Sequence, residues 1–223
     1  MRKALQPAFH DPPPVLGSAL VELDGEATEL SVATKAAGEL VGAPINVVNF
    51  LWAGLALGAI ATAIIVGNLW LLNFLHVLAG GLWTGIDLFM GFVVGPILRA
   101  CPFEARRAVI TRLTPKTLFI MPTLSISTGT SGWFLARQLG FLDLDYPQFG
   151  WVFAALVIVT ILTVQGLGYL LPTNLRVYFE LRKPNPDGAK VSAMMSRYFY
   201  VVGFQGAMQV VIIIVMARFA TGL

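Results

Sequence analysis

The sequence has few charged residues and almost no cysteine or histidine. Charged residues make up 12% of the 223 positions, roughly half the share of an ordinary soluble domain. The single cysteine, Cys101, excludes an intrachain disulfide and a metal site built from several cysteines. The chain also lacks a P-loop, a dinucleotide-binding glycine motif and the HExxH motif of metalloproteases. These absences argue against the common soluble enzymes and indicate a chain that lies mostly in lipid.

Hydrophobic residues, in contrast, make up 57% of the chain. A transmembrane helix needs about 20 consecutive, mainly apolar residues, and five segments meet this requirement. We therefore predict an all-α membrane helix bundle with five transmembrane helices, at about 45–66, 69–98, 118–139, 149–171 and 198–219. Gly67-Asn68 predicts a tight turn between the first two helices, and the fourth is expected to extend past Pro172 to Arg182.

The positions of lysine and arginine predict how these helices cross the bilayer. If the N-terminus is cytoplasmic, all but two of the 15 cations fall on the inner side, and only Arg137 and Arg218 lie outside. The positive-inside rule therefore predicts a cytoplasmic N-terminus and an outer C-terminus. Because the cations flank apolar segments instead of forming one basic face, the net charge of +3 does not indicate a nucleic-acid partner.

Residues 1–44 are expected to form a separate acidic, cytoplasmic region, ahead of a transmembrane domain over 45–223. The region has no signal-peptide pattern and holds half of the twelve acidic residues. Three consecutive prolines predict extended chain, an Asp-Gly pair predicts a hairpin turn, and the apolar spacing over 26–40 predicts a short amphipathic helix. Alternatively, the region is a tail that docks on this protein's own loops or on a partner.

Two ionisable side chains stand out within the second predicted helix, His76 and Asp87. Eleven helical steps of about 100° return to within roughly 20° of the start, so His76, Gly80, Trp83 and Asp87 share one stripe. Ionisable groups are costly in hydrocarbon and are usually functional. His76 is a candidate ligand for haem iron or copper, a proton carrier, or a hydrogen-bonding partner of a neighbouring helix. Asp87 is expected to be a neutral, hydrogen-bonded acid, suited either to a proton relay or to helix packing.

The third predicted helix is rich in small and hydroxylated residues, including Gly129. Such a face favours close helix packing, but it also suits a pocket for a flat cofactor or a water-filled passage. Arg137 stands at the outer end of this helix, at roughly the level of His76. It is a candidate partner for a haem propionate, or a cation that reaches to the interface. The mid-helix amides of Gln165, Gln205 and Gln209 are expected to bond across helices.

The run Leu75-His76-Val77-Leu78-Ala79-Gly80-Gly81-Leu82-Trp83-Thr84-Gly85 resembles the opening helix of the CopD/HemJ-like superfamily of small bacterial integral membrane proteins. Pro96-x-x-Arg99 and Gly132-Trp133-Phe134-Leu135-Ala136 continue the resemblance, as does Pro172-x-x-Leu175-Arg176. The resemblance implies a four-helix core over residues 69–219, with the first helix an addition, and a place in the bacterial cytoplasmic (inner) membrane. HemJ-like members are linked to haem b and CopD-like members to copper, and the histidine of the Leu-His pair, here His76, is the implied ligand.

Three functions follow from these residues. The leading hypothesis is a haem-b-binding or redox-associated membrane protein, in which His76 ligates iron and Trp83, Gly129 and Arg137 contribute to the cofactor pocket. A copper permease or proton-coupled permease using His76 and Asp87 is the first alternative. A non-catalytic subunit of a larger membrane complex or a homo-oligomer, assembled through residues 1–44, is the second.

Overall fold

The computed structural model of the chain describes Thr28 and residues 47–222. The chain divides into two units, Met1–Leu40 and Val41–Leu223, and all the helices discussed below belong to the second unit. Apart from Thr28, residues 1–44 lie outside the described residues. The predicted hairpin, amphipathic helix and docking on a partner therefore stay predictions.

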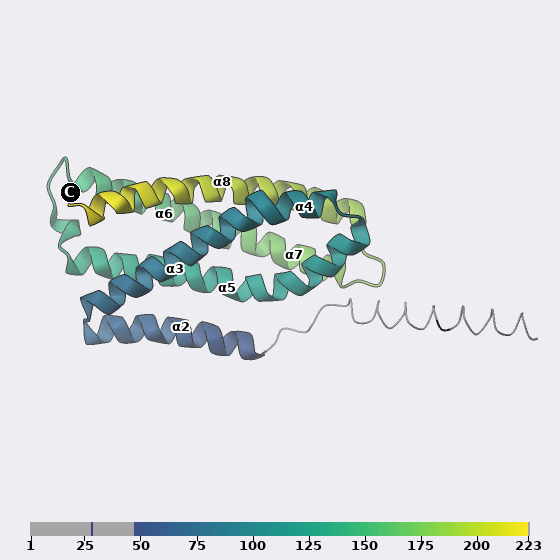
Figure 1. Cartoon of the computed structure of the whole chain (residues 1–223), viewed down its shortest axis with the longest axis horizontal. Coiled ribbons are helices and arrows are strands. Elements are labelled where there is room, and N and C mark those ends of the chain that lie inside the picture. The colour runs from purple at the N-terminus through teal and green to yellow at the C-terminus, as the bar shows by residue number, and fades with distance from the viewer. Residues whose placement is uncertain (1–27, 29–46, 223) are drawn as a thin grey trace, which may run out of the picture. The chain divides into compact units, whose positions relative to one another are not determined.

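The described part of the second unit is built from helices alone, as predicted (Figure 1). Two of its long helices contain a wide π turn, so that each is divided into three consecutive elements. The elements are α2 (Val47–Val66), α3 (Leu69–Phe89), η1 (Met90–Val94), α4 (Gly95–Ala100), α5 (Phe103–Gln138), η2 (Phe141–Asp143), α6 (Phe149–Gln165), η3 (Gly166–Leu170), α7 (Leu171–Leu181) and α8 (Gly188–Ala220).

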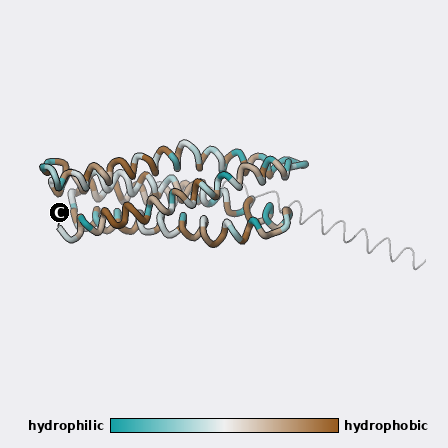
Figure 2. The backbone as a smooth tube through the Cα atoms, turned by 90° about the horizontal axis from the view of Figure 1, so that it is seen from above, coloured by the Kyte–Doolittle hydropathy of each residue, from teal (hydrophilic) through white to brown (hydrophobic). Residues whose placement is uncertain are grey.

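Among the described residues, four helices are long and apolar enough to cross a membrane, so the chain is a membrane protein. They are Val47–Val66, Leu69–Ala100, Phe149–Leu181 and Gly188–Ala220. The third predicted span lies inside α5, which is long enough but carries hydroxyl groups along its second half and charged residues along its first half. Figure 2 shows hydrophobic positions along the helices and hydrophilic positions gathering toward their ends. Five membrane spans therefore stay a prediction.

Two helices begin earlier than the sequence predicted. α5 starts at Phe103 instead of near 118, and α8 starts at Gly188 instead of near 198. The prediction stopped at the edge of the apolar segments, whereas α5 continues over Glu104, Ala105, Arg106 and Arg107, which are good helix formers. α8 begins where Asp187 caps it by accepting a hydrogen bond from the Lys190 backbone N–H at 3.0 Å. The connection before the last helix is therefore shorter than the predicted basic loop.

The predicted turn between the first two membrane helices is confirmed. Gly67 has φ of 68°, a left-handed conformation that glycine adopts without steric cost. The next residue, Asn68, caps α3, because its side-chain oxygen accepts a hydrogen bond from the Leu71 backbone N–H at 2.9 Å. This turn places α2 antiparallel to α3, and α2 packs against α3 and α5 (Figure 1).

The other four long helices form the core of the bundle. α3 and α5 share the most extensive contact, α6 lies along α8, and α8 in turn contacts α3 and η1. Three apolar clusters fill the interior. The first lies at the end of the bundle where α4 ends and α8 begins, and it includes Leu98, Ile110 and Phe199. The second surrounds Trp83, and the third packs α2 against α3 and α5.

The two π turns occupy equivalent places in their helices. η1 begins at Met90, six residues before Pro96, and η3 begins at Gly166, six residues before Pro172. Proline lacks the backbone N–H of a regular helix and its ring crowds the preceding turn, so a widened turn before each proline accommodates it. π turns often accompany functional sites. Here η3 lines the central cavity described below, and Met90 of η1 lines the second cavity beside it.

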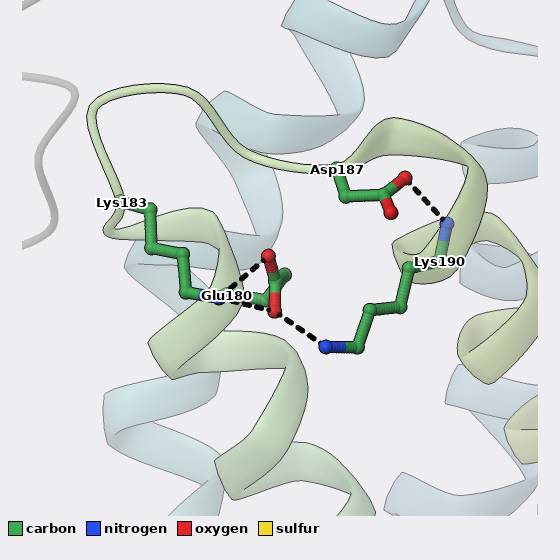
Figure 3. A network of polar contacts seen from close by, with 4 residues as sticks. All are labelled: Glu180, Lys183, Asp187 and Lys190. Atoms are coloured by element: carbon green, nitrogen blue, oxygen red, sulfur yellow. Dashed lines mark hydrogen bonds and ion pairs between the residues drawn. The ribbon is translucent and has the colours of Figure 1, made fainter.

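A network of charged side chains joins α7 to α8 (Figure 3). The Glu180 carboxylate is buried and accepts hydrogen bonds from the Lys183 ammonium at 2.8 Å and from the Lys190 ammonium at 3.0 Å. Because Lys190 lies beyond the loop, on α8, the carboxylate ties the two ends of the connection together. Two cations on one buried carboxylate also satisfy a charge that would be costly if left unpaired.

Replacing Glu180 by alanine is expected to lower the melting temperature of the purified protein, because both lysines lose their partner at the α7–α8 connection. Glu104 is the matched control, since its side chain is 72% exposed and its carboxylate forms a long ion pair with the Arg107 guanidinium, at 4.0 Å. Glu104→Ala should leave the melting temperature unchanged, because exposed ion pairs contribute little. Equal melting temperatures for the two variants would contradict a stabilising role for Glu180.

Candidate functional site

A buried polar site inside the bundle is centred on the carboxyl of Asp87. Asp87 is 4% exposed and lies on α3, where it faces α8. Its Oδ2 atom accepts hydrogen bonds from Gln205 Nε2 at 2.6 Å and from Gln209 Nε2 at 2.9 Å. The two glutamines are four residues apart and therefore project from one face of α8. Two amide donors thus converge on a single carboxyl oxygen.

A small cavity, the central cavity, lies beside this carboxyl. Its volume is about 40 Å³, which is room for about two water molecules. Its polar lining residues come from four helices, and they are Asp87, Thr117, Ser125, Asn174, Tyr198 and Gln205. Among the described residues, no lysine, arginine or histidine lines it, so no cation neutralises the carboxyl there.

Three buried amide oxygens near this site have no donor among the described residues. They are the Oε1 atoms of Gln165, Gln205 and Gln209. Gln165 binds α8 through its Nε2 atom, which donates to the Val201 carbonyl at 2.9 Å, and this leaves its oxygen unpaired. Buried polar atoms are almost always paired, so each of these oxygens is a place where a water molecule or another hydrogen-bond donor would bind. The site therefore has acceptors in excess and is suited to receive a hydrogen-bond donor.

His76 occupies a second polar point, at the crossing of α3 and α5. Its Nδ1 atom lies 3.1 Å from the Thr128 carbonyl oxygen and 3.1 Å from Ser131 Oγ. The imidazole packs against Gly132, where a Cβ atom would stand 2.8 Å from the ring Cε1. A carbonyl acceptor places the proton on Nδ1 and leaves the Nε2 lone pair available to a ligand.

The stripe predicted on α3 faces protein along its length. Gly80 packs against Thr128, since a Cβ added there would meet the Thr128 methyl group at 3.3 Å. Trp83 and Asp87 are both 4% exposed. Small residues on both helices, Gly80 on α3 and Gly132 on α5, allow α3 and α5 to approach closely.

The residues predicted to hold a cofactor do not gather at one place. Trp83 lines the central cavity, two helical turns away from His76. Gly129 has nothing within 4 Å of the position where a Cβ would stand. Arg137 is exposed, and nine residues of about 100° each place it on the face of α5 opposite Thr128, whose carbonyl bonds the histidine. His76 and Asp87 therefore belong to two separate sites.

Haem b and copper, the cofactors implied by the CopD/HemJ-like resemblance, can be tested against the residues around His76. The held Nδ1 atom and the available Nε2 atom fit the usual arrangement of a metal-bound histidine. His76 would therefore supply one ligand to a bound metal. The described residues contain no group of three or more His, Cys, Asp or Glu residues that could hold a metal ion, so a site built wholly from such side chains is not formed there.

Sequence reasoning assigned Gln205 and Gln209 only to helix packing and did not single out Tyr198 or Asn174. Tyr198 fell at the edge of the last predicted span, and Asn174 fell beyond the end of the fourth. A signal was present nevertheless, because Tyr198, Val202, Gln205 and Gln209 are spaced at three and four residues and share one face of α8. Their meeting with Asp87 depends on helix packing that the spacing does not reveal.

Comparisons of the chain with protein-family models, with curated proteins and with solved structures find no match.

Proposed function

We propose that this membrane protein carries protons through its helix bundle, with Asp87 as the group that binds and releases them. The observation that carries this proposal is the buried Asp87 carboxyl beside a water-sized cavity, with no cation to neutralise it and with unpaired acceptors around it. Of the three functions that the sequence suggested, the proton-coupled permease is the one that this geometry supports best.

The surroundings of Asp87 suit both protonation states of the carboxyl. Burial in an apolar bundle disfavours a charge, whereas the two amide donors of Gln205 and Gln209 stabilise a charged oxygen. In the protonation step, a hydronium ion in the cavity gives its proton to the carboxylate, and a water molecule and a neutral acid result. The new O–H group then supplies a donor to a site that has acceptors in excess. Release of the proton to water reverses the step.

The proposed arrangement in the bilayer has five spans, with α5 as the fifth beside the four apolar helices. Its second half, although hydroxyl-rich, carries no charged residue between Lys116 and Arg137, a length that suffices to cross the hydrocarbon core. Arg99, Arg106 and Arg107 flank the α4–α5 connection, and Arg182 and Lys183 lie in the α7–α8 connection, so both belong on the cytoplasmic side by the positive-inside rule. The N-terminus is then cytoplasmic, the C-terminus lies outside, and a bacterial inner membrane fits this arrangement.

Proton transport by the purified protein in vesicles tests the proposal. Vesicles of phosphatidylcholine and phosphatidylglycerol are loaded with a pH-sensitive dye, and a pH gradient is imposed with valinomycin present to balance charge. Vesicles that contain the protein should lose the gradient faster than empty vesicles, in proportion to the amount of protein. Equal rates with and without protein, at confirmed incorporation, would contradict the proposal.

Haem or copper binding at His76 is a second candidate function, favoured by the position of the imidazole. Hydrogen bonding of Nδ1 to the Thr128 carbonyl orients the ring and directs the Nε2 lone pair to a ligand. In this function, His76 would hold the iron of haem b, and the bound haem would supply one-electron chemistry. The resemblance of the Leu75–Gly85 run to CopD/HemJ-like proteins supports the same assignment.

An optical spectrum with metal analysis tests this second candidate. Protein purified from cells grown with a haem precursor should show a Soret band, and His76→Ala should remove the band. Asp87→Asn should leave the band in place, because the two sites are separate. A colourless, metal-free protein, or a band that persists in His76→Ala, would rule out His76 as the ligand.

A further inference from the structure

We propose that Asp87 exchanges protons with one end of the bundle through a relay formed by Tyr198 and Asn174. This end, the basic end, carries Arg99, Arg106 and Arg107. This proposal rests on the proposed function and names the route that serves the same site. The route has three parts, which are the central cavity, the hydrogen-bonded pair and a second cavity beyond it. The structure connects these parts through residues that they share.

The second cavity lies next to the central cavity, on the side of the basic end. Its volume is about 20 Å³, which suffices for about one water molecule. Both cavities are lined by Thr117, Asn174 and Tyr198. The two hollows are therefore separated by these three polar side chains, which come from α5, α7 and α8.

The geometry of the pair leaves one proton free to move. Asn174 Nδ2 donates a hydrogen bond to the Tyr198 hydroxyl oxygen at 3.0 Å. The tyrosine accepts from Asn174, so its own O–H can donate to a water molecule in either cavity. In the relay step, a hydronium ion on one side gives a proton to the Tyr198 oxygen and becomes water, while the hydroxyl proton of Tyr198 passes to a water molecule on the other side, which becomes hydronium. The neutral tyrosine is restored, and one proton has passed.

The packing around the two cavities gives the route its direction. Toward the outer end, the apolar cluster of Trp83, Ile158, Leu162 and Val215 closes the bundle above Asp87. Toward the other end, the second cavity reaches Leu98 and Ile110 of the first cluster, one residue before Arg99 and one turn after Arg106 and Arg107. Thr117, Asn174 and Tyr198 therefore line a path from the central cavity into the second cavity, which ends against the first apolar cluster on the side of the basic end.

Two tyrosine variants on α8 test whether the Tyr198 hydroxyl relays protons. Tyr198→Phe removes the hydroxyl but keeps the ring, and it should slow proton transport in the vesicle assay by about a hundredfold, the lower end of the usual contribution of a proton-transfer group. Tyr200→Phe is the matched control, because Tyr200 is 81% exposed on the same helix, and it should transport at the wild-type rate. The melting temperatures of both variants are measured alongside, so that a loss of transport is not mistaken for a loss of fold.

Asn174→Leu and Thr117→Val test the other two shared residues. Thr160→Val is the control for the threonine, because Thr117 and Thr160 both donate their hydroxyl to their own helix, at 3.1 and 2.7 Å, but Thr160 is exposed. Slower transport in the first two variants, with Thr160→Val unchanged, is the expected result. If Tyr198→Phe fails to fold, Asn174→Leu decides the same question.

The outcomes separate the route from the function. If Asp87→Asn abolishes transport while Tyr198→Phe, Asn174→Leu and Thr117→Val transport like wild type, the route is wrong and the proposed function stands. If Asp87→Asn transports like wild type, both proposals are overturned. Loss of transport in Asp87→Asn together with strong slowing in the relay variants supports both.

Discussion

Replacing Asp87 by asparagine should reduce proton transport to the rate of empty vesicles and leave the fold intact. The substitution removes the exchangeable carboxyl proton. It keeps the side-chain shape and one oxygen, which can accept the two hydrogen bonds from Gln205 and Gln209. Stability and transport are therefore affected separately. The measurement is gradient loss in vesicles, with thermal unfolding of the same preparations.

Two comparison variants sharpen this test. Asp145→Asn removes a carboxyl from an exposed position in the loop before α6 and should change neither transport nor stability. Asp87→Leu leaves the two amide donors without an acceptor, and it should lower the free energy of unfolding by about 1–3 kcal/mol for each unsatisfied group. An Asp87→Asn protein that folds and still transports protons would show that the carboxyl serves helix packing alone.

A second expected result concerns Gly95, at the start of α4. A Cβ atom at this position would stand 2.7 Å from Phe199 Cδ1, 2.9 Å from Phe199 Cε1 and 3.1 Å from the Met90 carbonyl oxygen. Phe199 is buried in the first apolar cluster, beneath the Arg99 guanidinium at 5.3 Å from the ring centre. Gly95→Ala therefore forces α4 and α8 apart, and overpacking of this kind costs about 1–3 kcal/mol.

Gly85→Ala is the matched control for this prediction. Gly85 lies on α3, in the same long helix, and a Cβ there has nothing within 4 Å. Because alanine is the better helix former, by up to about 1 kcal/mol, Gly85→Ala should be neutral or stabilising. Denaturant unfolding in detergent measures both variants. In Gly95→Ala/Phe199→Leu the smaller side chain should recover part of the loss, and a double variant as unstable as the sum of the two single variants would contradict the proposed clash.

The apolar helices were predictable because a membrane span leaves a direct record in the sequence. α2 and the α3–α4 helix each agree with the sequence prediction to within a few residues, because hydrophobic length and the Gly67-Asn68 turn define them locally. The starts of α5 and α8 were missed, since the helices continue into polar sequence that contains no membrane signal. Helix continuation depends on caps and packing that hydropathy does not measure.

The candidate site divides in the same way. The shared stripe of His76 and Asp87 on one helix follows from the spacing of two residues, and the helix period is a local property. What Asp87 meets depends on Gln205 and Gln209, which are 118 and 122 residues away in the chain. The separation of Trp83, Gly129 and Arg137 from one another likewise depends on how α3 and α5 cross.

By itself, the sequence determined that this chain is a helical membrane protein with an ionisable stripe on its second long helix. It did so because burial in lipid demands long apolar helices and makes each polar exception conspicuous. Only the tertiary structure decided that the exceptions form two sites, that amides from α8 hold Asp87, and that Tyr198 and Asn174 stand between two cavities. These contacts join side chains from different helices, and such pairings arise from packing in three dimensions and leave no pattern along the chain.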